Sequence, residues 1–483
     1  MYVLCHTDAR IREPACARGR RPVSATPAVP GAAPGARGIL RHLPLLLVVA
    51  VTAAQLARLV AFTRHYAVDI LFRDQWDLSG PLFSGASPWR VFDLQHGPHR
   101  QGLGGLVSWG LAVATRWDSR AEALAAVAIA ALAVVAALWL RRRLFGALTC
   151  SDVVIPLLLL SRLQYEVLAG PTNLSHGPLP VLLAVLLCLA WTLPTRPARY
   201  GTVLFLNFLA VFTGFGMFLG AITPVLLALD AWAAWRAGNR QAAAGAGAAL
   251  GVALLTVAAF FAGYTITPAA ACPHAPCPAA WTAPRDAGLM FANAFGLKWY
   301  DFAGPIVGIV LLACAAVVLV HHARRLTRRE PAAEQASRSA SILLGFSLLF
   351  VLGAAAGRFQ LGAPAAGASR YYLYVATGLL GLYVHLLTVR RTAVRRAGLA
   401  LAVAGAALAG LHLTGADADT VARLSRGKRE WKRCYVATES IAGCDRATGF
   451  VIYPRPEATG LAAKLDYLKR NRLNLYADAP GAQ

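Results

Sequence analysis

Long apolar segments recur along the chain from residue 41 onward, and short polar segments separate them. A membrane-spanning helix needs about 20 mostly apolar residues to cross the hydrocarbon core. The pattern therefore predicts about 11 membrane helices, and segments 151–163 and 201–214 are short enough to be partial or broken helices. The predicted helices cover residues 41–62, 120–140, 151–163, 177–193, 201–214, 217–235, 242–264, 302–321, 339–357, 372–388 and 397–414.

Composition supports this prediction. Hydrophobic residues make up 57% of the 483 residues and charged residues 14%, against about 25% charged residues in a soluble domain. This excludes a soluble globular protein, a disordered chain and a disulfide scaffold. Only helices and closed barrels satisfy their backbone in lipid, and the chain lacks the alternating pattern of barrel strands. We therefore expect an all-α polytopic membrane protein.

The net charge of +24 would suggest nucleic-acid binding on a soluble protein. Here the basic residues concentrate in short segments between apolar ones, as the positive-inside rule requires, so we expect no nucleic-acid partner. These segments contain Arg141, Arg142, Arg143, Arg196, Arg199, Arg236, Arg240, Arg324, Arg325, Arg328, Arg329, Arg390, Arg391, Arg395 and Arg396.

This charge asymmetry also predicts orientation and domain limits. Residues 1–38 are expected to form a disordered cytoplasmic tail, 39–414 the membrane domain, and 415–483 a small cap on the outer side. The predicted outer loops are 63–119, 164–176, 265–301 and 358–371.

The cysteines agree with an oxidising outer side. Cys272 and Cys277 share one outer loop, and Cys434 and Cys444 share the cap, so each pair is a candidate disulfide. Cys188 and Cys314 fall inside predicted helices, where we expect them to be buried packing residues.

Acids are scarce, and the first outer loop collects several of them. Asp74 and Asp77 are three residues apart, so they share one face of a helical turn. Two such carboxylates can hold a divalent cation, or divide into a base and an ionised partner. The alternative is a solvated polar loop with a helix cap. The same loop ends in a basic stretch with His96, His99 and Arg100.

Two further outer loops hold candidate binding residues. Glu166 is the only acid in loop 164–176, where it is either a site residue or a helix cap. Arg358 and Arg370 flank loop 358–371, and Tyr371 follows directly. The positive-inside rule gives no reason for arginine on this side. Such arginines either bind phosphate or snorkel as interfacial anchors.

The C-terminal cap has its own helical pattern. Leu461, Leu465, Leu468 and Leu473 recur near helical spacing, with Lys and Arg on the other face. We expect a small, partly helical cap that packs on the membrane domain. Its basic surface is suited to contact with anionic membrane lipids.

Four short stretches of the chain resemble the GT-C superfamily of membrane glycosyltransferases. They resemble more closely a poorly characterised bacterial group within or beside that superfamily. The resemblance covers about residues 40–478. The stretches are Asp74-Gln75-Trp76-Asp77, His96-Gly97-Pro98-His99-Arg100, Gln164 to Glu166, and Gly357-Arg358 with Ser369-Arg370-Tyr371.

The resemblance implies an enzyme of the bacterial cytoplasmic membrane. It would move a sugar from a polyprenyl-phosphate donor to a glycan, lipid or protein acceptor on the outer side. Asp74 would be the catalytic base and Asp77 its alternative or partner, in some members with a divalent cation. Arg358 and Arg370 would hold the leaving phosphate. The remaining predicted substrate-binding residues are His96, His99, Arg100, Glu166 and Tyr371.

One departure from the family pattern leaves the metal and the base open. Many members carry two adjacent acids, whereas Gln75 follows Asp74 here. The alternatives are a transporter or lipid flippase and a non-catalytic assembly protein. Glycines 214, 216 and 220 would suit the broken helices of a transporter, but the only ionisable residue that could drive coupling is Asp230, near a helix end. An enzyme requires Asp74 or Asp77 beside both arginines.

Overall fold

The computed structural model describes residues 34–266, 278–298, 300–328 and 334–477. The chain divides into two units, residues 1–43 and 44–483. In the first unit only the beginning of helix α1 (Pro34–Tyr66) is described, so most of the predicted tail 1–38 lies outside the described residues. Everything that follows concerns the second unit.

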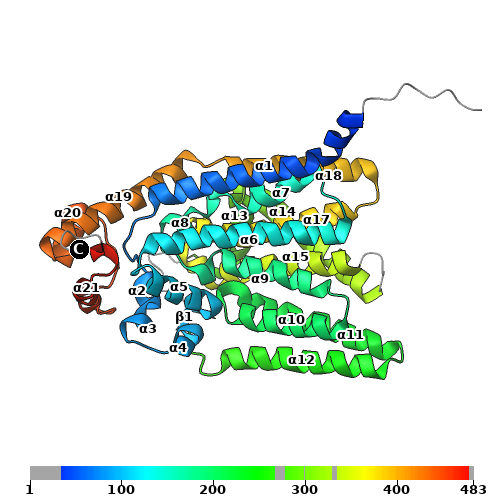
Figure 1. Ribbon diagram of the computed structural model, residues 1–483, viewed down its shortest axis with the longest axis horizontal. Helices are drawn as coiled ribbons and strands as arrows, with labels where there is room; N and C mark the ends of the chain where they lie inside the picture. Colours follow the sequence, from blue (N-terminus) through cyan, green and yellow to red (C-terminus); the bar gives the residue numbers. More distant parts are fainter. Residues whose placement is uncertain (1–33, 267–277, 299, 329–333, 478–483) are drawn as a thin grey trace, which may run out of the picture. The chain divides into compact units, whose positions relative to one another are not determined.

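Within the described residues, eight helical segments are long and apolar enough to cross a membrane. They run through the helices labelled in Figure 1 as α1 (Pro34–Tyr66), α6 (Ser119–Phe145), α11 (Leu219–Arg236), α12 (Arg240–Phe261), α14 (Ala303–Arg328), α15 (Glu334–Arg358), α17 (Tyr372–Thr388) and α18 (Thr392–Leu411). The predicted all-α membrane class is therefore confirmed, and the count of 11 spans is not.

The difference lies in three shorter helices, α7 (Val154–Leu159), α9 (Pro178–Trp191) and α10 (Arg196–Val211). The helix α7 stops early because the Ser161 hydroxyl caps the next turn, accepting from the Leu163 N–H at 3.1 Å. Every residue of α7 is buried. It is therefore enclosed by protein, where a short helix does not need to match the bilayer.

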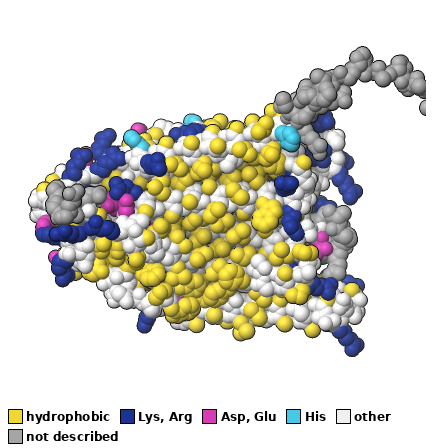
Figure 2. Space-filling view, viewed as in Figure 1, with side chains coloured by type: hydrophobic (Ala, Val, Ile, Leu, Met, Phe, Trp, Pro, Cys, Tyr) yellow, Lys and Arg dark blue, Asp and Glu magenta, His cyan; other side chains and the backbone are white. Residues whose placement is uncertain are grey.

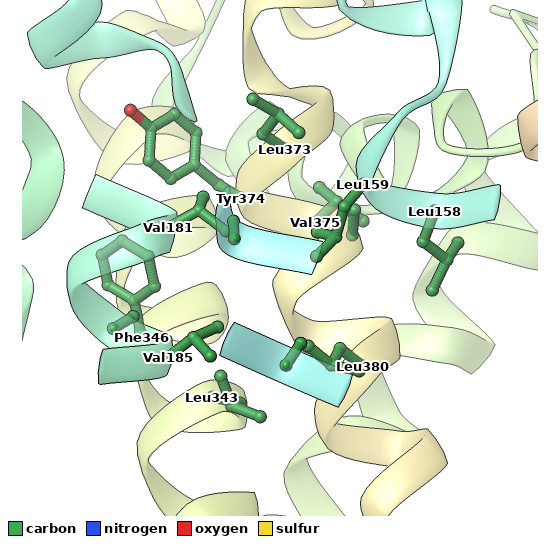
Figure 3. Close-up of a cluster of buried hydrophobic side chains, with 14 of the residues drawn as sticks. Leu158, Leu159, Val181, Val185, Leu343, Phe346, Leu373, Tyr374, Val375 and Leu380 are labelled. Carbon is green, nitrogen blue, oxygen red and sulfur yellow. The ribbon is translucent and has the colours of Figure 1, made fainter. Parts of the chain in front are cut away.

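The main core lies where α7, α9, α15 and α17 meet. Figure 3 shows Phe346 of α15 beside Val181 and Val185 of α9, and Leu159 of α7 beside Val375 of α17. The α15–α17 contact needs a small residue, since a Cβ at Gly378 would lie 2.4 Å from the Ser347 hydroxyl. Close backbone approach of this kind is how membrane helices gain packing energy.

The first predicted outer loop and the C-terminal segment lie together at one end of the bundle (Figure 1). The loop forms α2 (Gln75–Leu78), α3 (Gly80–Phe83), α4 (Pro88–Asp93), β1 (Gln95–His96), β2 (His99–Arg100) and α5 (Gly102–Ala114). The C-terminal segment forms α19 (Gly415–Thr438), α20 (Ile441–Thr448) and α21 (Leu461–Arg470).

The remaining described helices are short connectors, apart from one of eleven residues, α13. They are η1 (Cys150–Val153), η2 (Arg162–Gln164), α8 (Tyr165–Ala169), η3 (Leu174–His176), η4 (Gly214–Phe218), η5 (Ala280–Thr282), α13 (Ala283–Asn293), η7 (Phe359–Leu361), α16 (Ala363–Ala366), η8 (Ser369–Tyr371) and η9 (Asn474–Tyr476).

A second apolar core joins the C-terminal segment to the loop. Phe72 and Trp76 pack with Trp431 and with the apolar face of α21. The predicted amphipathic helix is confirmed, since Leu461, Leu465 and Leu468 are buried there. The Arg73 N–H also donates to the Ile452 carbonyl at 2.8 Å. The C-terminal segment therefore braces the loop that carries Asp74.

Two of the four cysteine predictions are confirmed. Cys434 and Cys444 form a disulfide, and Cys188 is buried. The prediction for Cys314 is wrong, because this side chain is exposed on α14, a helix at the edge of the bundle. The predicted pair Cys272–Cys277 lies outside the described residues.

Candidate active site

One cavity of about 280 Å³ lies between the first predicted outer loop, the predicted outer loops 164–176 and 358–371, and η4. Six of the predicted site residues line it: Asp74, His96, His99, Glu166, Arg358 and Arg370. They come from three of the predicted outer loops, 63–119, 164–176 and 358–371, which are far apart in the sequence. The volume is close to the lower end of the roughly 300–1,000 Å³ typical of ligand sites.

Asp74 precedes α2 and presents an accessible carboxylate, with 61% of its side chain exposed. The His96 Nε2 atom lies 3.8 Å from the Asp74 Oδ2 atom. The neighbouring His96 is the main cause that lowers the Asp74 pKa; partial burial opposes this effect, and the charges of Arg370 and Arg73 add to it. Asp74 is therefore ionised at neutral pH and free to accept a proton.

A two-residue hairpin turn sets the histidines in place. β1 and β2 pair so that His96 lies opposite His99, and Gly97 between them has φ +61°. Glycine adopts this conformation without the steric cost of a Cβ atom. The hairpin thus turns two histidines toward one cavity, which explains the His-Gly-Pro-His sequence.

His99 is buried and pairs with a second histidine, His176. Their rings meet edge to face, with centroids 3.9 Å apart. Burial lowers the pKa of His99 to about 3, and burial, with His99 as an adjacent titratable group, lowers the pKa of His176 well below its usual value. Both rings are neutral, and neither nitrogen of His99 finds a hydrogen-bond partner among the described residues. They are available to a polar ligand.

The position of His176 depends on a close backbone contact. Gly214 has φ +53°, and a Cβ there would lie 1.6 Å from the Ser175 carbonyl oxygen. This contact presses η4 against η3 and places Phe215 beneath both histidines, 4.9 Å from His99 and 5.2 Å from His176 between ring centroids. Gly214, one of the three glycines that would suit a transporter, therefore supports the floor of the cavity.

Arg358 and Arg370 line the cavity from the ends of two helices. The Arg358 Nη1 atom donates to the Tyr371 hydroxyl at 2.7 Å, and the Arg370 Nη1 atom lies 3.4 Å from Glu166 Oε2. The Arg370 Nε atom is buried without a hydrogen-bond partner among the described residues. Both guanidinium groups face the cavity rather than snorkelling, and they offer donors to an anion.

Three predicted site residues do not line this cavity. The Asp77 carboxylate accepts from the Tyr453 hydroxyl at 2.9 Å and from Thr459 Oγ1 at 3.0 Å. It thus ties the one-turn helix α2 to the C-terminal segment. Among the described residues, no three His, Cys, Asp or Glu side chains are grouped to hold a metal ion.

Arg100 and Tyr371 act as supports. The Arg100 guanidinium donates to the Phe260 carbonyl at 3.0 Å and pairs with Asp93 at 2.7 Å, which fastens the hairpin to the end of α12. The Tyr371 side chain is buried and holds Arg358.

Sequence reasoning did not assign His176, Phe215 or Arg73 to the site. Asn173 and His176 precede the proline that begins α9, which marks a helix start rather than a site. Arg73 has φ +50°, an uncommon conformation for a side chain with a Cβ, directly before Asp74. No signal in the sequence indicated that strain.

The fold and its apolar helices define the chain as an all-α polytopic membrane protein. No family model, curated protein or solved structure matches it.

Proposed function

We propose that the chain is a GT-C-type glycosyltransferase that uses a polyprenyl-phosphate sugar. One observation carries the proposal: an ionised, accessible carboxylate, Asp74, lines the same cavity as Arg358 and Arg370. A proton acceptor and a phosphate-binding pair are the two parts that sugar transfer from a lipid phosphate requires.

In the proposed reaction, the acceptor hydroxyl oxygen bonds to C1 of the sugar while the bond from C1 to the phosphate oxygen breaks. The leaving phosphate keeps the electron pair, and Arg358 and Arg370 stabilise the charge that develops on it. Asp74 takes the proton of the acceptor hydroxyl. The neutral imidazoles of His99 and His176 hydrogen-bond the sugar hydroxyls, because a neutral histidine both donates and accepts.

The proposed location is the bacterial cytoplasmic membrane, with the N-terminus in the cytoplasm and the cavity on the outer face. The basic segments that connect the helices support this orientation. Arg141 to Arg143 lie near the end of α6 and Arg236 ends α11, whereas the cavity lies at the other end of these helices.

The test uses the full chain in nanodiscs with a polyprenyl-phosphate hexose or pentose and a cell-envelope fraction that supplies acceptors. Mass spectrometry measures the polyprenyl phosphate released. We expect release with the wild-type protein, and an Asp74→Asn variant should be slower by about 10²–10⁴-fold, the usual contribution of a positioned base.

Asp77→Asn is the matched control, since it makes the same chemical change three residues away and outside the cavity lining. It should retain transfer per folded molecule. The proposal fails if no donor releases polyprenyl phosphate, or if Asp74→Asn releases it as fast as the wild type.

A further inference from the structure

A second hollow, of about 660 Å³, lies between the end of α1, the beginning of α6 and the helix α19. It shares no lining residue with the candidate active site. We call it the basic groove. Five cationic side chains and a single acid, Asp69, line it. The cations are Arg64, Arg120, Arg429, Lys432 and Arg433.

The floor of the basic groove is a fixed structure. The buried Asp69 carboxylate accepts from the Ser119 N–H at 3.0 Å and from the Asn474 side chain at 2.7 Å, and Lys432 lies 3.9 Å from its second oxygen. Arg429 donates to the His65 carbonyl, which fastens α19 to the end of α1. The groove therefore exists as a built hollow between three helices.

The rim carries positive charge that the protein does not neutralise. Arg64 and Arg433 are exposed, and neither forms a hydrogen bond or an ion pair within the part of the chain that the structure describes. Asp69 is the only acid in the lining, so the groove keeps a net positive charge. Such a hollow is complementary to an anion.

The position of the basic groove indicates which kind of anion binds there. The apolar span of α1 ends at Tyr66 and that of α6 begins at Ser119, so the groove lies where the spans leave the hydrocarbon and lipid headgroups begin. The apolar surface that precedes it on α1 is mostly exposed, and Figure 2 shows Lys and Arg gathered beside a broad hydrophobic surface. A lipid can thus reach the groove sideways, with its chains along α1.

We propose that the basic groove binds the phosphate headgroup of an anionic membrane phospholipid. The lipid bridges the end of α1 and the C-terminal segment. This interaction is independent of the proposed sugar transfer, since the two hollows have no residue in common.

The test measures phosphatidylglycerol bound to the full chain in detergent by native mass spectrometry, with phosphatidylcholine and inorganic phosphate in parallel. We expect phosphatidylglycerol to bind and phosphatidylcholine to bind weakly. An Arg64→Gln/Arg433→Gln double variant should bind phosphatidylglycerol about 30-fold more weakly, because each basic residue near a membrane surface adds about fivefold in affinity. These two residues form no internal contact, so the variant should fold.

The matched control is Arg446→Gln/Arg455→Gln, which removes two exposed charges of the C-terminal segment outside the groove. It should bind phosphatidylglycerol like the wild type. Equal binding of the two phospholipids, an equal loss in both double variants, or displacement of the lipid by millimolar inorganic phosphate would each overturn the proposal.

Discussion

The two ends of the helical bundle differ in how accessible their acidic groups are. At the end away from the cavity, Arg141 pairs with Asp152 at 2.7 Å, and Tyr383 donates to the same carboxylate at 2.6 Å. Arg338 pairs with Asp230 and, at 2.7 Å, with Glu334. At the cavity end, Asp74 is accessible.

This difference distinguishes charged groups that stabilise the fold from polar groups that are available to a ligand. A buried ion pair that is satisfied by the protein holds helices together, and removing one partner is costly. A buried polar atom without a hydrogen-bond partner also lowers the stability of the fold. Such an atom is expected where a bound ligand supplies the missing hydrogen bond. The nitrogens of His99 and the Nε atom of Arg370 belong to this second group. Asp230, the residue considered for transport coupling, belongs to the first.

Among the variants that test this comparison, the largest effect should follow from removing a guanidinium group at the cavity. Arg370→Ala should slow release of polyprenyl phosphate by about 10²–10³-fold, the usual loss when one donor to developing negative charge is removed. Arg370→Lys should recover part of the rate, since it keeps the charge but not the fork geometry. Thermal unfolding should change little. A rate within twofold of the wild type would remove Arg370 from the proposed mechanism.

At the end of the bundle away from the cavity, removing an arginine should lower stability and leave transfer unchanged. Arg141→Ala leaves the buried Asp152 carboxylate without its cation, which typically costs about 3–5 kcal/mol. Urea or thermal unfolding in detergent measures this loss of stability. Transfer per folded molecule should stay unchanged, and a large fall in specific activity without loss of stability would contradict the comparison.

Acid should weaken the cavity end through His99. Its pKa is about 3 in the folded chain, against 6.5 when unperturbed, so the unfolded chain binds more protons between these values. The free energy of unfolding therefore falls as the pH drops below about 6.5. Asp69 opposes this, because burial raises its pKa to about 6 and favours the folded chain in acid.

Comparing the wild type with His99→Gln isolates the histidine, since Asp69 is present in both. The melting temperature of the wild type should fall more between pH 7.5 and pH 5.5 than that of His99→Gln. Parallel shifts in the two proteins would mean that His99 is not kept neutral by burial.

The smallest effect should come from the contact that removes Asp77 from the cavity. Tyr453→Phe loses one hydrogen bond to the Asp77 carboxylate, worth about 1 kcal/mol. Limited proteolysis of the C-terminal segment should become slightly faster, with transfer nearly unchanged. A fall in activity as large as that of Asp74→Asn would restore Asp77 to the reaction.

Much of the fold follows from local patterns. Hydropathy located the long spans, helical spacing located α21, and cysteine placement located the disulfide Cys434–Cys444. Hydropathy predicted 11 spans, whereas eight helical segments of the described residues are long and apolar enough to cross a membrane. Hydropathy alone does not distinguish a helix in lipid from one surrounded by protein. The helix α7 shows this, since its apolar side chains are all covered by protein.

The sequence by itself determined the class of the protein and most of the residue types of the site, because membrane insertion and chemical identity are properties of short segments. Only the tertiary structure decided which residues meet. It turned Asp74 to the cavity and Asp77 to Tyr453, and it brought His176 against His99. Such choices depend on packing between segments that are far apart in the sequence, and no local pattern records them.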